Sequence, residues 1–302
     1  MKLLTNLLMK FDKEYLSYIN DLNFTNFDLK KYFLELLNEL SYTKRKEIWN
    51  NKILKNRKFN DELYKLSNPF YIGFGNPKSK ILFIGKEKGF DLNEHKDLLF
   101  EESINNIYHW EKIIRDDLIS KPNEINKLFN FSPLFPLSYN YKKPFRKSHT
   151  WYIYSKVLAA SENNLSDYES YFNKSDYKSS LFHKCFITEF NYVPSKYSKG
   201  LGEGINKRIK FLKNDFFNKF KVIVVGARTY LNGKRFNKNG DKIIEDTFNV
   251  SFSENIFNPR IKSKMFKSDN KIVILTSQLS GAAGWNNSDF LLMGQIIKEN
   301  VS

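Results

Sequence analysis

The chain has one cysteine, four histidines and no long apolar run among its 302 residues. A single thiol, Cys185, excludes an internal disulfide, a four-cysteine iron–sulfur cluster and a cysteine-based zinc site. The histidines form no pair at metal-ligand spacing on a helix, and no His-Glu-x-x-His motif occurs. We therefore expect no metal ion, no iron–sulfur cluster and no other cofactor, with Cys185 a buried and unreactive thiol.

No stretch approaches the roughly 20 apolar residues that a membrane-spanning helix needs. The apolar stretch at the N-terminus is interrupted by Thr5 and Asn6 and ends at Lys10, which is too short for a secretory signal peptide. The sequence thus predicts a protein without membrane association, in the reducing environment of the cytoplasm.

Acidic residues are few relative to basic ones: 33 Asp and Glu stand against 49 Lys and Arg, giving a net charge of +16. Such a surplus favours polyanions, either nucleic acid or an anionic membrane surface. The abundance of Lys, Asn, Ile, Phe and Tyr is typical of the codon bias of an AT-rich genome, and this bias explains part of the positive charge. The distribution is more informative, because residues 196–238 hold twelve Lys and Arg against only Glu203 and Asp215. We expect DNA as the partner, bound by a monomer.

Residues 1–67 show helical spacing of apolar residues and are predicted to form an N-terminal helical extension that ends near Asn68-Pro69. In residues 68–302, apolar runs alternate with longer helical stretches, including Ile205–Phe217 and Ser288–Glu299. The pattern predicts an α/β domain with a single open, mostly parallel four-stranded sheet flanked by helices. The four predicted strands are Lys80–Ile84, Cys185–Phe190, Phe220–Gly226 and Lys271–Thr276.

Ligands of open parallel sheets bind just past the carboxyl ends of the strands. The loop after the first predicted strand, Gly85-Lys-Glu-Lys-Gly89, carries the carboxylate Glu87. The second strand exits through Glu189 and Asn191, and the fourth through Gln278 and a glycine-rich loop. Two carboxylates and two amides at one edge suit recognition of a polar planar ligand and a bond cleavage without a metal.

The order of these motifs resembles that of diverged members of the uracil-DNA glycosylase superfamily. The loop 85–89 is similar to the family's Gly-Gln-Asp-Pro-Tyr or Gly-Glu-x-Pro-Gly loop, with Glu87 at the position of the water-activating acid. Glu189 or Asn191 matches the residue that reads the base edge, and Gln278-Leu-Ser280 stands where the family has His-Pro-Ser. The chain lacks the family's Pro in the first motif and its His in the last. These departures put uracil in doubt as the substrate and suggest a modified pyrimidine.

The resemblance gives Glu87 the role of stabilising an oxocarbenium-like sugar, and gives Gln278 that of donating to the departing base. Each has a structural alternative: Glu87 as a solvated turn residue beside Lys86 or Lys88, and Gln278 as a turn-stabilising amide. For base binding we expect Glu189, Asn191, Ser280 and Phe90, with Tyr71 and Phe100 as further stacking candidates. A read-out by Glu189 in place of an Asn would favour a base that presents a donor, such as the amine of cytosine.

DNA contacts are expected from basic and aromatic side chains near these loops. Trp285 is predicted to fill the vacated base stack, or else to anchor its own loop. His149 is a candidate contact, with a hydrogen-bonded structural His as the alternative. For the basic row on the helix before the third strand, the alternative is a solvated helix face. The predicted DNA-binding residues are Lys86, Lys88, His149, Lys207, Arg208, Lys210 and Trp285.

These observations favour a metal-independent DNA glycosylase that removes a modified or mispaired pyrimidine, such as a modified cytosine in foreign DNA. Two alternatives stay open: a non-catalytic nucleic-acid-binding protein on the same fold, and a hydrolase of free nucleosides or nucleotides.

Overall fold

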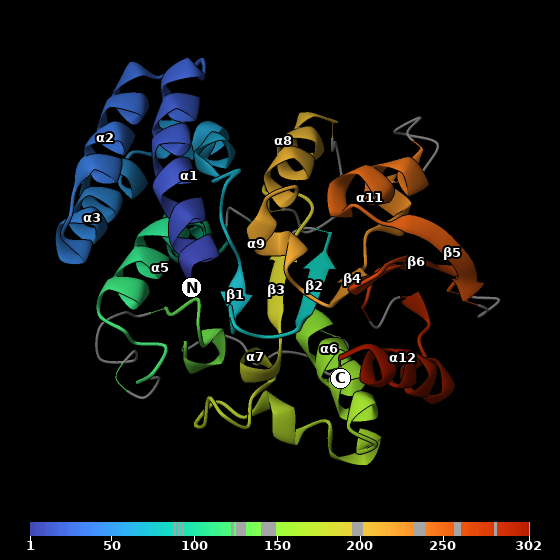
Figure 1. The fold of residues 1–302 in the computed structure, drawn as a ribbon. Helices are drawn as coiled ribbons and strands as arrows, with labels where there is room; N and C mark the ends of the chain where they lie inside the picture. Colours follow the sequence, from blue (N-terminus) through green and yellow to red (C-terminus); the bar gives the residue numbers. More distant parts are fainter. Residues whose placement is uncertain are drawn as a thin grey trace.

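The computed structural model of the protein describes residues 1–86, 89, 91, 94–121, 124, 131–139, 149–194, 202–231, 239–256, 261–280 and 283–301. These residues form an α/β fold in which helices flank an open, mixed sheet of seven strands (Figure 1). In spatial order the strands are β1 (Phe74–Gly75), β3 (Phe186–Glu189), β2 (Ile81–Gly85), β4 (Val222–Val225), β7 (Lys271–Leu275), β6 (Ser263–Ser268) and β5 (Ser251–Ile256).

The four strands predicted from the sequence form the parallel centre of this sheet, in the order β3-β2-β4-β7. Their side chains are almost all buried, because helices cover both faces, and this is why each reads as a continuous apolar run. The prediction of a four-stranded sheet is wrong in number, however. Three antiparallel strands extend it: β1 pairs with β3, β6 with β7, and β5 with β6.

The missed strands have no strong local signal. β1 has only two residues, and β5 is exposed along most of its length and interrupted by an irregularity between Phe252 and Glu254. β6 is richer in Ser and Lys than the central strands. Strands at the edge of an antiparallel sheet can expose one face or both, so they need no continuous apolar run.

Helices α6 (Thr150–Ser161) and α12 (Asn287–Val301) cover one face of the sheet, and α8 (Gly202–Leu212), α9 (Asp215–Asn218) and α11 (Gly240–Phe248) cover the other (Figure 1). The helix predicted over residues 205–217 is in fact two helices, α8 and α9, because the chain turns at Lys213 and Asn214. The other short helical segments are α4 (Lys96–Leu98), α5 (Asn106–Arg115), η5 (Pro136–Ser138), η6 (Leu165–Asp167), η7 (Ser170–Phe172), α7 (Leu181–Lys184) and α10 (Arg228–Leu231).

Gly294 of α12 allows α12 and α6 to approach closely. A Cβ atom built at Gly294 would lie 2.5 Å from the carbonyl carbon of Ala160 and 2.6 Å from the amide nitrogen of Ser161. Both are backbone atoms, so neither can move aside without shifting the helix. A residue with a side chain at this position would push the two helices apart.

The N-terminal segment is helical, as predicted, and packs against the sheet domain (Figure 1). Its helices are α1 (Lys2–Asp21), α2 (Phe27–Asn38), α3 (Tyr42–Ile48), the π-helix η1 (Trp49–Leu54) and the 3₁₀-helix η2 (Arg57–Leu66). Trp49 of η1 stacks on Phe100 of a second π-helix, η3 (Leu99–Ile104), with ring centroids 5.4 Å apart. Phe100 is thus a core residue, and the prediction that it stacks on a base is wrong.

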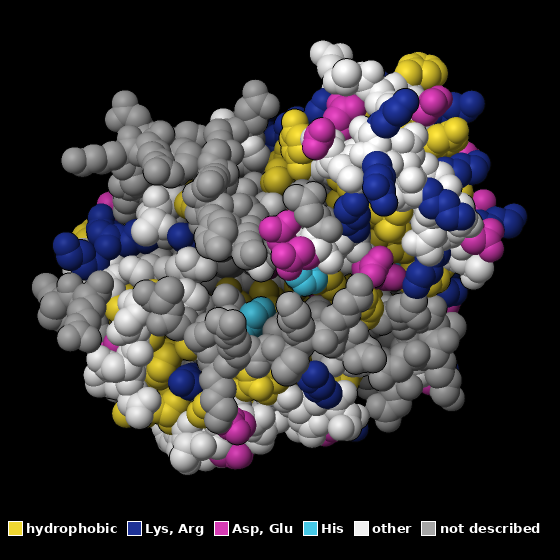
Figure 2. All heavy atoms as spheres, turned by 180° about the vertical axis from the view of Figure 1, so that it is seen from behind, with side chains coloured by type: hydrophobic (Ala, Val, Ile, Leu, Met, Phe, Trp, Pro, Cys, Tyr) yellow, Lys and Arg dark blue, Asp and Glu magenta, His cyan; other side chains and the backbone are white. Residues whose placement is uncertain are grey.

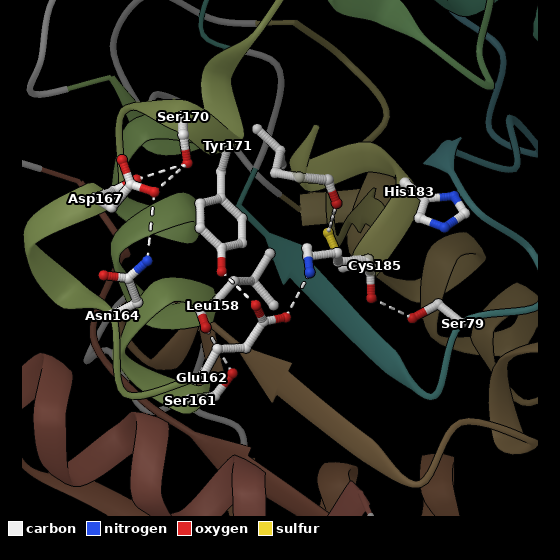
Figure 3. A network of polar contacts seen from close by, with 12 residues as sticks. Ser79, Leu158, Ser161, Glu162, Asn164, Asp167, Ser170, Tyr171, His183 and Cys185 are labelled. Carbon is white, nitrogen blue, oxygen red and sulfur yellow. Dashed lines mark hydrogen bonds and ion pairs between the residues drawn. The ribbon is translucent and has the colours of Figure 1, made fainter. Parts of the chain in front are cut away.

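At the edge where the strands begin, a polar network joins α6, η7 and α7 to the start of β3 (Figure 3). Glu162, just past α6, accepts hydrogen bonds from the Tyr171 hydroxyl at 2.5 Å and the Lys184 ammonium at 2.6 Å. Cys185 is buried, as predicted, and its thiol donates to the carbonyl of Leu181. These contacts are structural, because they lie at the opposite edge from the strand exits.

No helix in the described part of the chain is both long enough and apolar enough to cross a membrane.

Candidate functional site

The exits of the four parallel strands lie side by side at one edge of the sheet. Gly85 at the end of β2 pairs with Glu189 at the end of β3, and the Asn191 amide donates to the Lys86 carbonyl at 2.7 Å. On the other side of β2, the Gly226 amide donates to the Ile84 carbonyl at 2.8 Å. A Cβ at Gly226 would lie 3.3 Å from the amide nitrogen of Leu279. The exits of β3, β2, β4 and β7 therefore form one continuous rim.

Glu189 is the buried carboxyl group of this rim, with 9% of its surface exposed. Its Oε2 accepts a hydrogen bond from the hydroxyl of Tyr71, which is itself fully buried. Its Cγ would lie 3.4 Å from a Cβ placed on Gly85, so the absence of a side chain there leaves room for it. Burial raises the pKa of Glu189 to about 8, although the nearby guanidinium of Arg208 acts in the opposite direction.

Arg208 of α8 is fully buried, which makes the prediction that it contacts a DNA phosphate wrong. Its guanidinium donates to the carbonyls of Glu189, Pro69 and Tyr71 at 2.8 to 3.0 Å, and to the hydroxyl of Thr188 at 2.8 Å. It also lies over the ring of Tyr71, 4.5 Å from the centroid. Burial lowers the pKa of Arg208 to about 9, so the group stays charged at neutral pH.

Helical spacing could have revealed this position. Ile205, Arg208 and Leu212 follow one another at intervals of three and four residues, and all three are buried. Arg208 therefore occupies the inward stripe of α8, whereas Lys210 is exposed and Lys207 is partly exposed. The phosphate contacts predicted for Lys210 and Lys207 stay predictions. The ammonium of Lys207 lies 4.6 Å from the ring centroid of Tyr18.

Asn191 and Lys86 lie where a base-binding and a phosphate-binding residue were predicted. Asn191 is buried next to Glu189, and its side-chain oxygen accepts from the Val193 amide at 3.3 Å. Gly204 of α8 packs against it, since a Cβ there would lie 2.7 Å from that oxygen. Lys86 is partly buried, with its ammonium 4.9 Å from the ring centroid of Tyr230.

The loop after β7 carries Gln278, Ser280 and Trp285. The Gln278 carbonyl accepts from the Ser280 amide at 2.9 Å and from the Trp285 indole nitrogen at 3.2 Å. Trp285 also stacks on Phe290 with ring centroids 5.7 Å apart. In this conformation Trp285 anchors the loop, which is the second of the two predicted roles. The Gln278 side chain is partly buried and makes no hydrogen bond to the described residues, so its amide can donate to a ligand.

His149 precedes α6 and caps it. Its Nδ1 accepts from the Trp151 amide at 3.2 Å, and burial lowers its pKa to about 4. A neutral imidazole offers no positive charge to a phosphate, so the structural alternative describes His149 better than the predicted DNA contact.

Three predicted site residues, Glu87, Lys88 and Phe90, lie outside the described residues, as do parts of the basic segment 196–238. Described lysines of that segment do not all lie near the site. Lys219 contacts the carbonyl of Pro77, in the turn before β2, at the opposite edge of the sheet. Figure 2 shows the face opposite to that in Figure 1, and the described Lys and Arg side chains there are interspersed with Asp and Glu.

The sequence interpretation missed the role of Tyr71, which was considered only as a stacking face. Its ring packs against Arg208, and its hydroxyl donates a hydrogen bond to Glu189. These contacts join residues far apart in the chain, so no local sequence motif predicts them. Among the described residues, no group of three or more His, Cys, Asp or Glu side chains is placed to hold a metal ion.

The described part of the site thus combines a buried carboxyl group, a neighbouring amide and a second amide across the rim, all of which can form hydrogen bonds. No family model, curated protein or solved structure matches this chain.

Proposed function

We propose that this protein is a metal-independent DNA glycosylase, which hydrolyses the N-glycosidic bond of a modified or mispaired pyrimidine and leaves an abasic site. From the sequence alone, one such base is a modified cytosine in foreign DNA. We propose DNA as its partner, a monomer as the acting form and the cytoplasm as its location. The positive net charge of the chain supports the choice of DNA.

The observation that carries the proposal is the position of Glu189. A buried carboxyl group with one oxygen held by Tyr71 lies beside Gly85, the first residue of the loop that carries Glu87. Base-modifying enzymes take the base out of the stack and read its hydrogen-bonding edge in a pocket. Glu189 and Asn191 offer such an edge next to the loop that is predicted to supply the catalytic acid.

In the proposed reaction the bond between the base nitrogen and the sugar carbon breaks, and the sugar develops positive charge. The Glu87 carboxylate stabilises that charge and orients the water molecule that adds to the sugar carbon. Gln278 donates its amide N–H to the departing base, which takes the bonding electron pair. The water molecule loses a proton to the Glu87 carboxylate as it adds, and that proton neutralises the departing base. Glu189 and Asn191 hold the base throughout.

The test is incubation with duplexes that each carry one candidate base: uracil, hypoxanthine, 5-methylcytosine, 5-hydroxymethylcytosine or glucosylated cytosine. Alkali converts an abasic site into a strand break, which is scored on a denaturing gel. Glu87→Gln should abolish cleavage and retain DNA binding. Glu94→Gln is the matched control, because Glu94 is an exposed glutamate farther along the same connection.

Cleavage of none of the duplexes, with DNA binding that weakens steeply as salt increases, would support the non-catalytic binding protein instead. The replacement of the family's His by Gln278 favours that alternative, since an amide stabilises a departing base less than an imidazolium does. Hydrolysis of free nucleosides, with no salt-dependent binding to DNA, would point to the nucleoside hydrolase.

A further inference from the structure

The two oxygens of the Glu189 carboxyl group differ in their surroundings. Oε2 accepts the hydrogen bond from the Tyr71 hydroxyl. Oε1 makes no hydrogen bond to the described residues. It also does not belong to the buried polar atoms that lack a partner, so it remains accessible to solvent. With 9% of the residue exposed, Oε1 is the atom through which Glu189 can meet a ligand.

Arg208 does not serve as the counter-ion that such a group would need to be ionised. All of its hydrogen bonds in the described structure go to main-chain carbonyls and to the hydroxyl of Thr188. Its guanidinium plane is held by the Tyr71 and Phe211 rings, with centroids at 4.5 and 4.6 Å. It contacts the backbone of Glu189 and not its carboxylate.

Among the described residues, the other groups around Glu189 also bring no opposite charge into contact with its carboxyl group. Tyr154 of α6 faces the same side of the sheet, and its hydroxyl would lie 3.2 Å from a Cβ on Gly85. Lys86, next to Gly85, directs its ammonium over the ring of Tyr230. A carboxyl group that is buried and makes no ion pair with the described residues favours the protonated state, in agreement with the raised pKa of Glu189.

We propose that Glu189 is a hydrogen-bond donor to the substrate, with Tyr71 holding Oε2 as an acceptor and Oε1 carrying the proton toward the ligand. This inference rests on the proposed function for the identity of the ligand as a nucleobase. It reverses the specificity that the sequence favoured. A carboxylate reads a donor such as an exocyclic amine, whereas a carboxylic acid with Oε2 already engaged reads an acceptor such as an exocyclic carbonyl.

The first test is independent of any substrate. The protein is labelled with ¹³C at the side-chain carboxyl of glutamate, and the Glu189 signal is assigned by its loss in Glu189→Gln. We expect it to titrate with a midpoint at about pH 8. A midpoint in the ordinary range for glutamate, about 4 to 5, would overturn the proposal.

Tyr71→Phe tests the assignment of the two oxygens. It keeps the ring against Arg208 and removes the hydroxyl, which favours the ionised form by donating to it, so the midpoint should rise by about one pKa unit. Tyr154→Phe is the matched control and should leave the midpoint in place. Its hydroxyl also lies near Gly85, but the hydrogen bond to the Glu189 carboxyl group in the described structure comes from Tyr71. Equal midpoints in both variants and the parent protein would refute the role of Tyr71.

The second test uses fluorescence anisotropy with two duplexes, one containing uracil, with a carbonyl at C4, and one containing 5-methylcytosine, with an amine there. Below the midpoint the ratio of affinities should favour uracil, and above it the ratio should fall at least tenfold. In Glu189→Gln the ratio should not vary with pH. A constant ratio in the parent protein refutes donor recognition. Failure to bind either duplex counts against the proposed function alone, since the titration of Glu189 is measured without DNA.

Discussion

Replacing Arg208 by leucine distinguishes a buried structural role from the phosphate contact that the basic sequence around it suggested. The substitution removes the guanidinium that donates to three carbonyls and one hydroxyl joining α8, β3 and the segment before β1. Leucine fills part of the volume and restores none of these hydrogen bonds.

The magnitude follows from the acceptors that lose their partner. A buried polar group left without a hydrogen bond costs about 1 kcal/mol or more. Four acceptors therefore give a loss of about 4 kcal/mol. Removing the buried charge of Arg208 also removes its desolvation cost, which offsets part of this loss. We expect a loss of about 3 kcal/mol in the free energy of unfolding, a large fraction of the stability of an ordinary domain.

Urea denaturation followed by circular dichroism measures this loss as a shift of the midpoint. Lys210→Leu is the matched control on the same helix, because Lys210 is exposed, and should change stability by no more than about 0.5 kcal/mol. If Lys210 contacts a phosphate, its replacement should also reduce the salt slope of DNA binding by about one. An unchanged midpoint for Arg208→Leu together with weaker DNA binding would refute the buried role and restore the phosphate contact.

Three further outcomes follow from the described structure. The pKa of Glu189 is raised from 4.5 to about 8, so between these pH values the folded state keeps a proton that the unfolded state has lost. The free energy of unfolding should therefore fall by up to about 5 kcal/mol as the pH rises through this range. In a pH series of urea melts, Glu189→Gln should flatten this part of the profile. Gly294→Ala should destabilise the protein by about 2 kcal/mol in thermal melts although alanine favours helix, because the added methyl meets the backbone of α6; a stabilised variant would contradict this packing. Trp285→Ala should cost about 2 kcal/mol if the indole anchors its loop, whereas unchanged stability with weaker duplex binding would identify it as the wedge.

The central strands and the closing helix could be predicted from the sequence because their signals are local. β2 and β4 are buried on both faces, so every residue along them is apolar, and α12 repeats its apolar residues at helical spacing. The motif order likewise selected the exits of four strands, and the structure places these exits along one rim. β5 and β6 escaped prediction because partly exposed edge strands carry no such continuous run.

The roles of individual site residues depended on contacts between distant segments. The sequence by itself established the apolar strands, the single cysteine and the positive charge, since these depend on composition and near neighbours. Only the tertiary structure decided that Arg208 is buried while Lys210 two residues later is exposed, and that Tyr71 reaches Glu189 across more than a hundred residues of chain. Burial determines whether a charged side chain meets solvent, a ligand or a backbone carbonyl, and burial is set by how the helices dock on the sheet.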